Sequence, residues 1–244
     1  MLRRSAPPNG MSGPLALVGG AEFGPGNEAT DQRLVEAAEA GPAFVLPTAA
    51  ARQAPERAVA NARRWFARWG LDVAELPVLK RGDARSAELT AWAREGRLFY
   101  LVGGDPGLVV DVLWDSPVWD AIVRAWRGGA ALAGSSAGAM ALGGWTLLMA
   151  KWPHHRRRRF ARALGVVPGL AVLPHYAGAG HSWELEEPPS DAVVLGVDEA
   201  TSAYWDGEQW LALGPGSIHL NGQTFTEGQV VEGLPRPLVG SGHP

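Results

Sequence analysis

The segment from Gly134 to Ala139 has the composition of a nucleophile turn. It reads Gly-Ser-Ser-Ala-Gly-Ala and places Ser136 in a G-x-S-x-G pattern, between an apolar run at 130–133 and a small-residue helix expected at 137–142. An attacking serine hydroxyl needs exposure above a sheet, and a tight strand-to-helix turn with small neighbours provides it. The helix start also offers backbone N–H groups, Ala137 first, to a developing oxyanion. The pattern therefore predicts nucleophilic catalysis by Ser136; a close-packed connection without catalytic function is the alternative.

Five segments resemble, in the same order, motifs of the serine peptidases that include aspartyl dipeptidase and cyanophycinase. They are residues 17–22, 101–105, 136–139, 174–176 and 196–201. The resemblance extends from about residue 15 to residue 205. It implies the fold of class I glutamine amidotransferases, with serine in place of their cysteine.

The resemblance also implies roles for residues outside the turn. His175 would be the general base that takes the Ser136 proton, and Glu199 would be the acid that orients His175. Asp198 is the alternative acid, because adjacent residues on a strand face opposite ways and only one can reach the histidine. The N–H groups of Gly104 (or Gly103) and Ala137 would form the oxyanion hole.

A small peptide is the expected substrate, and its side-chain preference stays open. Gly103, Asp105 and Tyr176 are candidate substrate-binding residues. The cyanophycinase branch carries several arginines after its histidine, whereas residues 177–181 contain no basic residue other than His181. A β-aspartyl preference is therefore not carried over.

Residues 154–159 read His-His-Arg-Arg-Arg-Arg and form the most basic run of the chain. A solvated face is the simplest interpretation of Arg156–Arg159. One arginine folding over the site to bind a carboxylate is the alternative. His154 with His155, or His181 with Glu184, lacks a third convergent ligand, so we expect no metal, and no cofactor is implied.

Two other functions fit parts of the pattern. An α/β-hydrolase esterase would use the triad order serine, acid, histidine, which Ser136, Asp198 and His219 satisfy. A ligand-binding protein that kept the fold and lost the activity is the non-enzymatic alternative.

The elements that must position these residues alternate through the first 145 residues. This alternation predicts an α/β fold with a doubly wound, mostly parallel sheet and helices on both faces, followed by short antiparallel C-terminal strands at one sheet edge. Strands are expected at 14–20, 44–47, 71–79, 98–102, 130–133, 193–197, 203–205, 210–213 and 217–220. Helices are expected at 31–40, 55–69, 86–94, 108–126 (broken near 116–117) and 137–142.

The bulk composition is that of a soluble globular protein. The chain has 244 residues, 46% apolar and 19% charged, with a formal net charge of −3 and no cysteine. Absence of cysteine excludes a disulfide framework, a thiolate metal site and a cysteine nucleophile, and the charge gives no field for nucleic acid or membranes. We expect a cytoplasmic protein with a disordered leader at 1–13 and a single α/β hydrolytic domain at 14–244. Assembly as a homodimer stays open.

Overall fold

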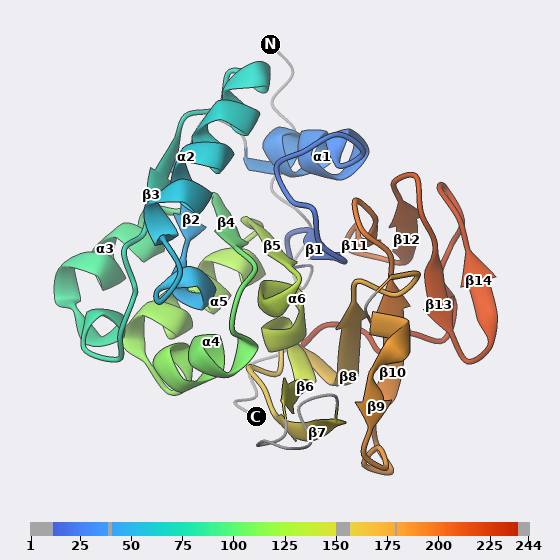
Figure 1. Ribbon diagram of the computed structural model, residues 1–244. Coiled ribbons are helices and arrows are strands. Elements are labelled where there is room, and N and C mark those ends of the chain that lie inside the picture. Colours follow the sequence, from blue (N-terminus) through green and yellow to red (C-terminus); the bar gives the residue numbers. More distant parts are fainter. Residues whose placement is uncertain (1–11, 39–40, 150–156, 179, 239–244) are drawn as a thin grey trace.

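The computed structural model describes residues 12–38, 41–149, 157–178 and 180–238, and these form two mixed β-sheets with helices packed around them (Figure 1). This confirms the predicted α/β class. Ser12 is already buried, and the Gly13 N–H donates to the Trp126 carbonyl at 2.8 Å. Ser12 and Gly13 of the expected leader therefore pack on the domain, and its other residues, 1–11, lie outside the described residues.

The first sheet has five mutually parallel strands, and two further strands that pair antiparallel extend it at one edge. Its order is β12-β11-β1-β5-β4-β2-β3, in which β1 through β5 are mutually parallel and β11 and β12 are added antiparallel at the β1 edge. The strands are β1 Leu15–Val18, β2 Ala43–Leu46, β3 Val73–Glu75, β4 Leu98–Leu101, β5 Ala131–Ser135, β11 Ser202–Trp205 and β12 Trp210–Leu213.

Helices cover both faces of this sheet, as expected. Alternate residues of its central strands belong to two apolar clusters: Leu15 and Leu17 of β1 join one, and Ala16 and Val18 join the other. The second cluster is closed by α1 and α2, and the first by α3 to α6. The helices are α1 Glu28–Ala38, α2 Pro55–Phe66, α3 Ala87–Glu95, α4 Pro106–Leu113, α5 Pro117–Arg127 and α6 Ala137–Leu142.

Side-chain caps fix the starts of three of these helices. Ser86, Asp105 and Ser116 accept hydrogen bonds from backbone N–H groups in the first turns of α3, α4 and α5, which stabilises each start by about 1 kcal/mol. In the described part of the chain, no helix combines the length and apolarity that a membrane crossing requires.

The second sheet holds strands that the sequence reasoning placed elsewhere or did not find. Its order is β14-β13-β10-β8-β6-β7-β9. Of the four C-terminal strands expected at one sheet edge, β11 and β12 lie there, whereas β10 and β13 belong to this second sheet. The apolar cluster that includes Leu15 and Leu17 continues into β8, β10 and β13, so the two sheets share one core. The strands are β6 Gly143–Met149, β7 Arg157–Arg162, β8 Val167–Pro174, β9 Glu184–Leu185, β10 Val193–Val197, β13 Ile218–Leu220 and β14 Gln223–Phe225.

The pairing registers bring several strand ends to one place. β1, β5 and β4 are neighbours, and Val18 pairs with Ser135 while Leu101 pairs with Gly134. In the second sheet β8 and β10 are parallel neighbours that end together, with Val197 opposite Pro174. The carboxyl ends of parallel strands are the usual place for a functional site in an open α/β sheet.

Candidate active site

Ser136 occupies the sharp turn between β5 and α6. Its backbone has φ 49° and ψ −112°, a conformation that costs a non-glycine residue on the order of 1–3 kcal/mol. The turn follows β5, a central strand of the parallel part of the first sheet, as the nucleophile pattern predicted. Small neighbours are required: a Cβ on Gly134 would lie 2.5 Å from the Gly138 carbonyl carbon, and one on Gly138 would lie 2.3 Å from the Leu101 carbonyl oxygen.

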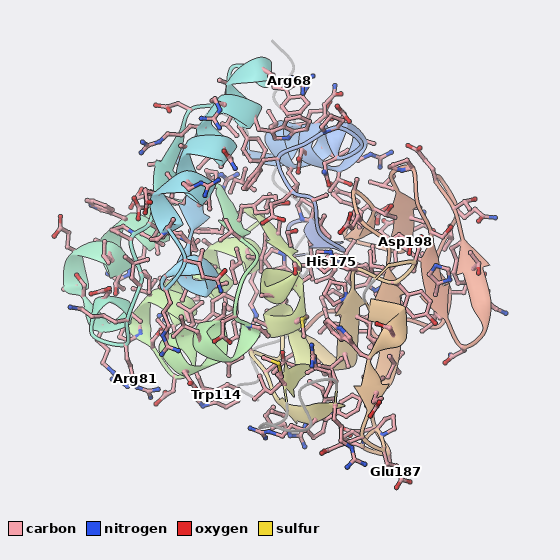
Figure 2. All side chains as sticks on the ribbon, in the orientation of Figure 1. Arg68, Arg81, Trp114, His175, Glu187 and Asp198 are labelled. Carbon is pink, nitrogen blue, oxygen red and sulfur yellow. The ribbon has the colours of Figure 1, made fainter. Side chains whose placement is uncertain are left out.

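His175 follows β8 and faces the Ser136 hydroxyl. Its Nε2 lies 2.8 Å from Ser136 Oγ, within hydrogen-bond distance. The His175 backbone also has positive φ, 104°, so both partners depart from regular strand geometry. The imidazole packs closely on Gly20, whose Cβ, if present, would lie 2.2 Å from the ring. Figure 2 shows His175 near the middle of the molecule, close to the end of β1.

Glu199 completes a chain of hydrogen bonds behind His175. Its Oε1 lies 2.9 Å from His175 Nδ1. A proton on Nδ1 can be donated to this carboxylate, which leaves Nε2 free to accept from the serine hydroxyl. The Glu199 side chain is 64% exposed, so solvent screens its charge and its main contribution here is orientation.

Asp198 and His219 lie in a separate cluster. The Asp198 carboxylate accepts hydrogen bonds from the Ala177 N–H at 2.8 Å and the Ser217 N–H at 2.9 Å. His219 Nε2 lies 3.5 Å from Asp198 Oδ1, and its ring stacks on Tyr176 at 4.4 Å between centroids. The structure therefore places His175, rather than His219, at the serine, and removes the geometric support for the esterase triad.

The glycine loop after β4 lies beside the serine. The Gly103 N–H donates to the Glu22 carboxylate at 2.9 Å, so this N–H already has a partner and Gly104 is the one of the two glycines whose N–H could bind an oxyanion. Gly104 is exposed and has φ 142°, and a Cβ there would lie 2.3 Å from the Ala49 carbonyl oxygen. Ala137 is the first residue of α6, and the first N–H groups of a helix have no acceptor within it.

Of the three candidate substrate-binding residues, Asp105 and Tyr176 have side chains that already contact other partners. The Asp105 carboxylate caps α4 by accepting from the Leu108 N–H at 3.1 Å. The Tyr176 ring packs over Gly196 of the second sheet, besides its stack on His219. Gly103, the third, contributes only backbone and lies against Ser136: a Cβ on it would be 3.3 Å from the serine Cβ.

The basic run falls partly on a strand. Arg157, Arg158 and Arg159 belong to β7, and the Arg158 guanidinium lies 4.4 Å from the centroid of the Trp183 ring. Arg156, His154 and His155 lie outside the described residues. Within the part of the chain that is described, no three His, Asp or Glu side chains gather as metal ligands would.

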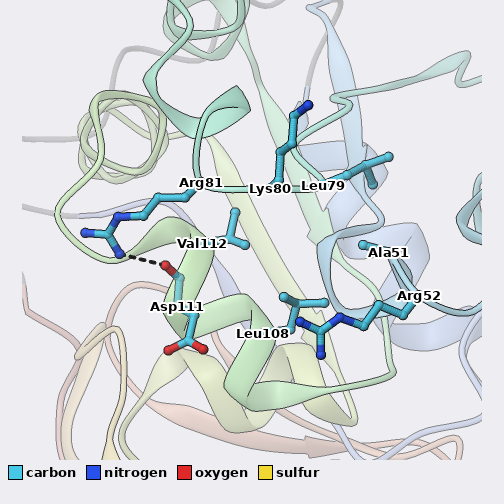
Figure 3. Close-up of a pocket in the computed structure, with 8 residues that line it drawn as sticks. All are labelled: Ala51, Arg52, Leu79, Lys80, Arg81, Leu108, Asp111 and Val112. Atoms are coloured by element: carbon cyan, nitrogen blue, oxygen red, sulfur yellow. Dashed lines mark hydrogen bonds between the residues drawn. The ribbon is translucent and has the colours of Figure 1, made fainter.

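A surface cavity of about 550 Å³ lies beside the glycine loop but does not include Ser136 (Figure 3). The Asp105 N–H of the glycine loop donates to the Ala49 carbonyl, and Ala51, two residues further along the chain, lines the cavity. The cavity and the loop are therefore neighbours. Arg81 is held at its edge by a 2.8 Å hydrogen bond to the Asp111 carbonyl. Its lining residues are Ala51, Arg52, Leu79, Lys80, Arg81, Leu108, Asp111 and Val112.

Glu22 and Ser135 touch the site although the sequence reasoning gave neither a role. Ser135 Oγ donates to Glu22 Oε2 at 2.8 Å. The one signal for Glu22 was its place in the resembling segment 17–22. Ser135 could not be distinguished because its contact arises from strand pairing and the fold of a distant loop.

Comparison with known proteins places the chain among peptidases. The model of peptidase family S51 matches residues 15–207. Cyanophycinases of Trichormus variabilis and of a Nostoc species are each 26% identical over 239 residues, covering 94% of this chain and 78% of the relative. The crystal structure of a peptidase from an acI-B1 Actinobacterium superposes with a TM-score of 0.79 at 28% identity, covering 91% of this chain and 97% of that one. A putative peptidase E from Listeria monocytogenes has a TM-score of 0.58 at 14% identity, covering 84% and 99%, and shares the fold.

Proposed function

The chain belongs to peptidase family S51, and we propose that it hydrolyses small peptides as a serine peptidase with Ser136, His175 and Glu199 as its catalytic triad. One observation carries the proposal: Ser136 Oγ lies 2.8 Å from His175 Nε2, and His175 Nδ1 lies 2.9 Å from Glu199 Oε1. A hydroxyl, an imidazole and a carboxylate in this order are the arrangement that activates a serine.

In the first half of the reaction, His175 Nε2 takes the hydroxyl proton as Ser136 Oγ attacks the peptide carbonyl carbon. The tetrahedral oxyanion accepts hydrogen bonds from the Gly104 and Ala137 N–H groups, and one such donor lowers the barrier by about 3 kcal/mol. His175 returns the proton to the leaving amine, the C–N bond breaks, and an ester to Ser136 remains.

In the second half, water replaces the amine. His175 takes a proton from water, the resulting hydroxide attacks the ester carbonyl, and the acid product leaves as the proton returns to Ser136 Oγ. Glu199 holds the imidazole in the tautomer with its proton on Nδ1 and stabilises the imidazolium in both halves.

The substrate proposal is limited to short peptides. Because two relatives are named cyanophycinase, cyanophycin is one substrate to include in the test. We propose no preference for an acidic side chain, because Ser136, His175 and Glu199 are used for catalysis and the Asp105 and Tyr176 side chains already have other partners.

A panel of dipeptides and tripeptides that differ at the N-terminal residue tests this function. Release of free amine should be measured for the wild type and for Ser136→Ala. We expect hydrolysis of at least one peptide, abolished by Ser136→Ala. Hydrolysis that persists at the wild-type rate in Ser136→Ala would contradict the proposal, as would hydrolysis of simple esters with no peptide cleaved.

A further inference from the structure

The segment from Gly19 to Phe23, here called the β1 loop, contacts each part of the active site. Gly20 lies against the His175 ring, and its carbonyl accepts from the Ala200 N–H at 2.9 Å, next to Glu199. Ala21 and Phe23 both have positive φ, 56° and 57°. Two non-glycine residues in this conformation cost energy, and such strain is retained where a surrounding structure demands it.

Glu22 is the residue of the β1 loop that reaches the oxyanion side of the site. Its Oε1 accepts from the Gly103 N–H at 2.9 Å, and its Oε2 accepts from Ser135 Oγ at 2.8 Å. Gly103 stands between Glu22 and the nucleophile: a Cβ on this glycine would be 3.1 Å from Glu22 Oε1 and 3.3 Å from Ser136 Cβ. The carboxylate thus bridges the residue before Ser136 and the residue before Gly104.

The chemistry of this bridge is that of two charge-assisted hydrogen bonds. Such bonds are roughly twice as strong as neutral ones. Ser135 is fully buried, so its hydroxyl depends on a protein partner. Without the hydrogen bond to Glu22, the Gly103 peptide could change its orientation, because two adjacent glycines have little conformational preference of their own.

We propose that Glu22 is a positioning residue for the peptidase reaction: it fixes the Gly103 peptide so that the Gly104 N–H points at the oxyanion. This inference rests on the proposed function. Because the oxyanion exists only after attack, loss of Glu22 lowers kcat and leaves KM nearly unchanged.

The test compares Glu22→Ala with Glu22→Gln in steady-state hydrolysis of a peptide that the wild type cleaves. Active enzyme is counted by titration with a fluorophosphonate, so that misfolded protein does not enter kcat. Glu22→Ala should lower kcat by about 100-fold, the loss typical of a displaced oxyanion donor, with KM within about twofold. Glu22→Gln should recover kcat to within about fivefold of wild type, because the amide oxygen can accept from Gly103 and the amide N–H can donate to Ser135 Oγ.

Glu28→Ala is the matched control. Glu28 is a carboxylate close by in sequence that also accepts a backbone N–H, that of Gly26 at 2.7 Å, and its ion pair with Arg68 at 3.9 Å lies on the surface. Its removal should leave kcat unchanged. Should Glu22→Ala yield no soluble protein, Glu22→Met, of similar length and without an acceptor, takes its place with the same expectation.

Three results would overturn the role of Glu22. They are wild-type kcat per active site in Glu22→Ala, a rise in KM with kcat retained, or a loss in Glu22→Gln as large as in Glu22→Ala. The Ser136→Ala variant distinguishes failure of the role of Glu22 from failure of the proposed peptidase function. If Ser136→Ala is inactive while Glu22→Ala is fully active, only the role of Glu22 fails; if Ser136→Ala is active, the proposed function fails as well.

Discussion

At the scale of single residues, the structure divides two histidines and two acids between different tasks. His175 and Glu199 form one hydrogen-bonded line with Ser136, while His219 and Asp198 hold the second sheet and its loops. Replacement of His175 or Glu199 should therefore lower kcat, whereas replacement of His219 or Asp198 should leave kcat nearly unchanged.

Replacing the two histidines should give opposite results. His175→Ala removes the group that takes the Ser136 proton, and we expect a loss of kcat of several orders of magnitude, up to about 10⁶-fold as in other triads. His219→Ala should change kcat by less than about threefold, because His219 contacts Tyr176 and Asp198 instead of the serine. Peptide hydrolysis by the two purified variants measures this, and the reverse order of losses would contradict the assignment.

The two acids should separate catalysis from stability. Glu199→Gln should lower kcat by about 100-fold, less than the 10⁴-fold loss for a buried triad acid, because Glu199 is exposed and screened. Asp198→Ala should instead lower the free energy of unfolding by about 1–3 kcal/mol, since it leaves the Ala177 and Ser217 N–H groups without an acceptor. Kinetics and denaturant titration of both variants test this; a larger loss of kcat in Asp198→Ala than in Glu199→Gln would make Asp198 the better candidate for the acid.

The sequence could identify the three proposed triad residues but not the residues that hold them in place. Ser136 stands in a pattern whose mechanics are readable from its neighbours, and His175 and Glu199 follow from the resemblance. Gly20 and Glu22 act through contacts with residues more than 80 positions away, which no local pattern encodes.

At the scale of elements, the parallel half of the molecule was the most predictable part. Its strands are short apolar runs, and its helices start at readable caps such as Ser86 and Ser116. The break in the expected helix 108–126 was found because Ser116 and Pro117 are typical of a helix start, and they begin α5 after α4 has ended at Leu113.

Two strands of the second sheet, β7 and β8, could not be predicted from the sequence, for physical reasons. β7 reads Arg-Arg-Arg-Phe-Ala-Arg and has no buried residue, so its sequence lacks the alternation of apolar and polar residues that marks a half-buried strand. β8 contains Pro168, Gly169 with φ 70° and Pro174, residues that usually mark turns. Both strands are defined by the strands they pair with, β6 and β9 for β7 and β6 and β10 for β8, and sequence periodicity cannot show this pairing.

The β1 loop provides a test at this scale. Gly20→Ala would place a Cβ 2.2 Å from the His175 ring at a backbone φ of 130°, so we expect the imidazole to move and kcat to fall by at least about 100-fold. Gly82→Ala is the matched control, since Gly82 has an ordinary φ of −65° and open space around it. Hydrolysis rates per titrated active site decide the matter; equal rates for the two variants would show that the loop does not hold His175.

At the scale of the whole molecule, one buried carboxyl couples the fold to pH. Asp31 on α1 is fully buried, and Trp65 Nε1 donates to its Oδ2 at 2.7 Å. Burial raises the pKa of Asp31 from 3.8 to about 7, with smaller contributions from the negative charges of Glu28 and Glu22, while the Trp65 hydrogen bond lowers it.

The raised pKa of Asp31 makes the free energy of unfolding depend on pH in one direction. Between pH 3.8 and about 7 the folded chain keeps a proton on Asp31 that the unfolded chain releases, so the free energy of unfolding falls as pH rises through this window. Asp31→Asn keeps an acceptor for Trp65 and removes the titration. The variant should equal the wild type near pH 4 and exceed it above pH 7, on the order of a few kcal/mol.

Thermal unfolding across this pH range measures the effect, with the exposed Asp72→Asn as the control that should keep the wild-type slope. An unchanged pH slope in Asp31→Asn would show that Asp31 is not the group responsible.

The central claim is that Ser136 is an activated nucleophile, and covalent labelling with a fluorophosphonate tests it most directly. Intact-mass and peptide mass spectrometry should find one adduct per chain, located on Ser136. Ser136→Ala should give none, and His175→Ala should label far more slowly. An adduct on another serine, or labelling of His175→Ala at the wild-type rate, would contradict the account.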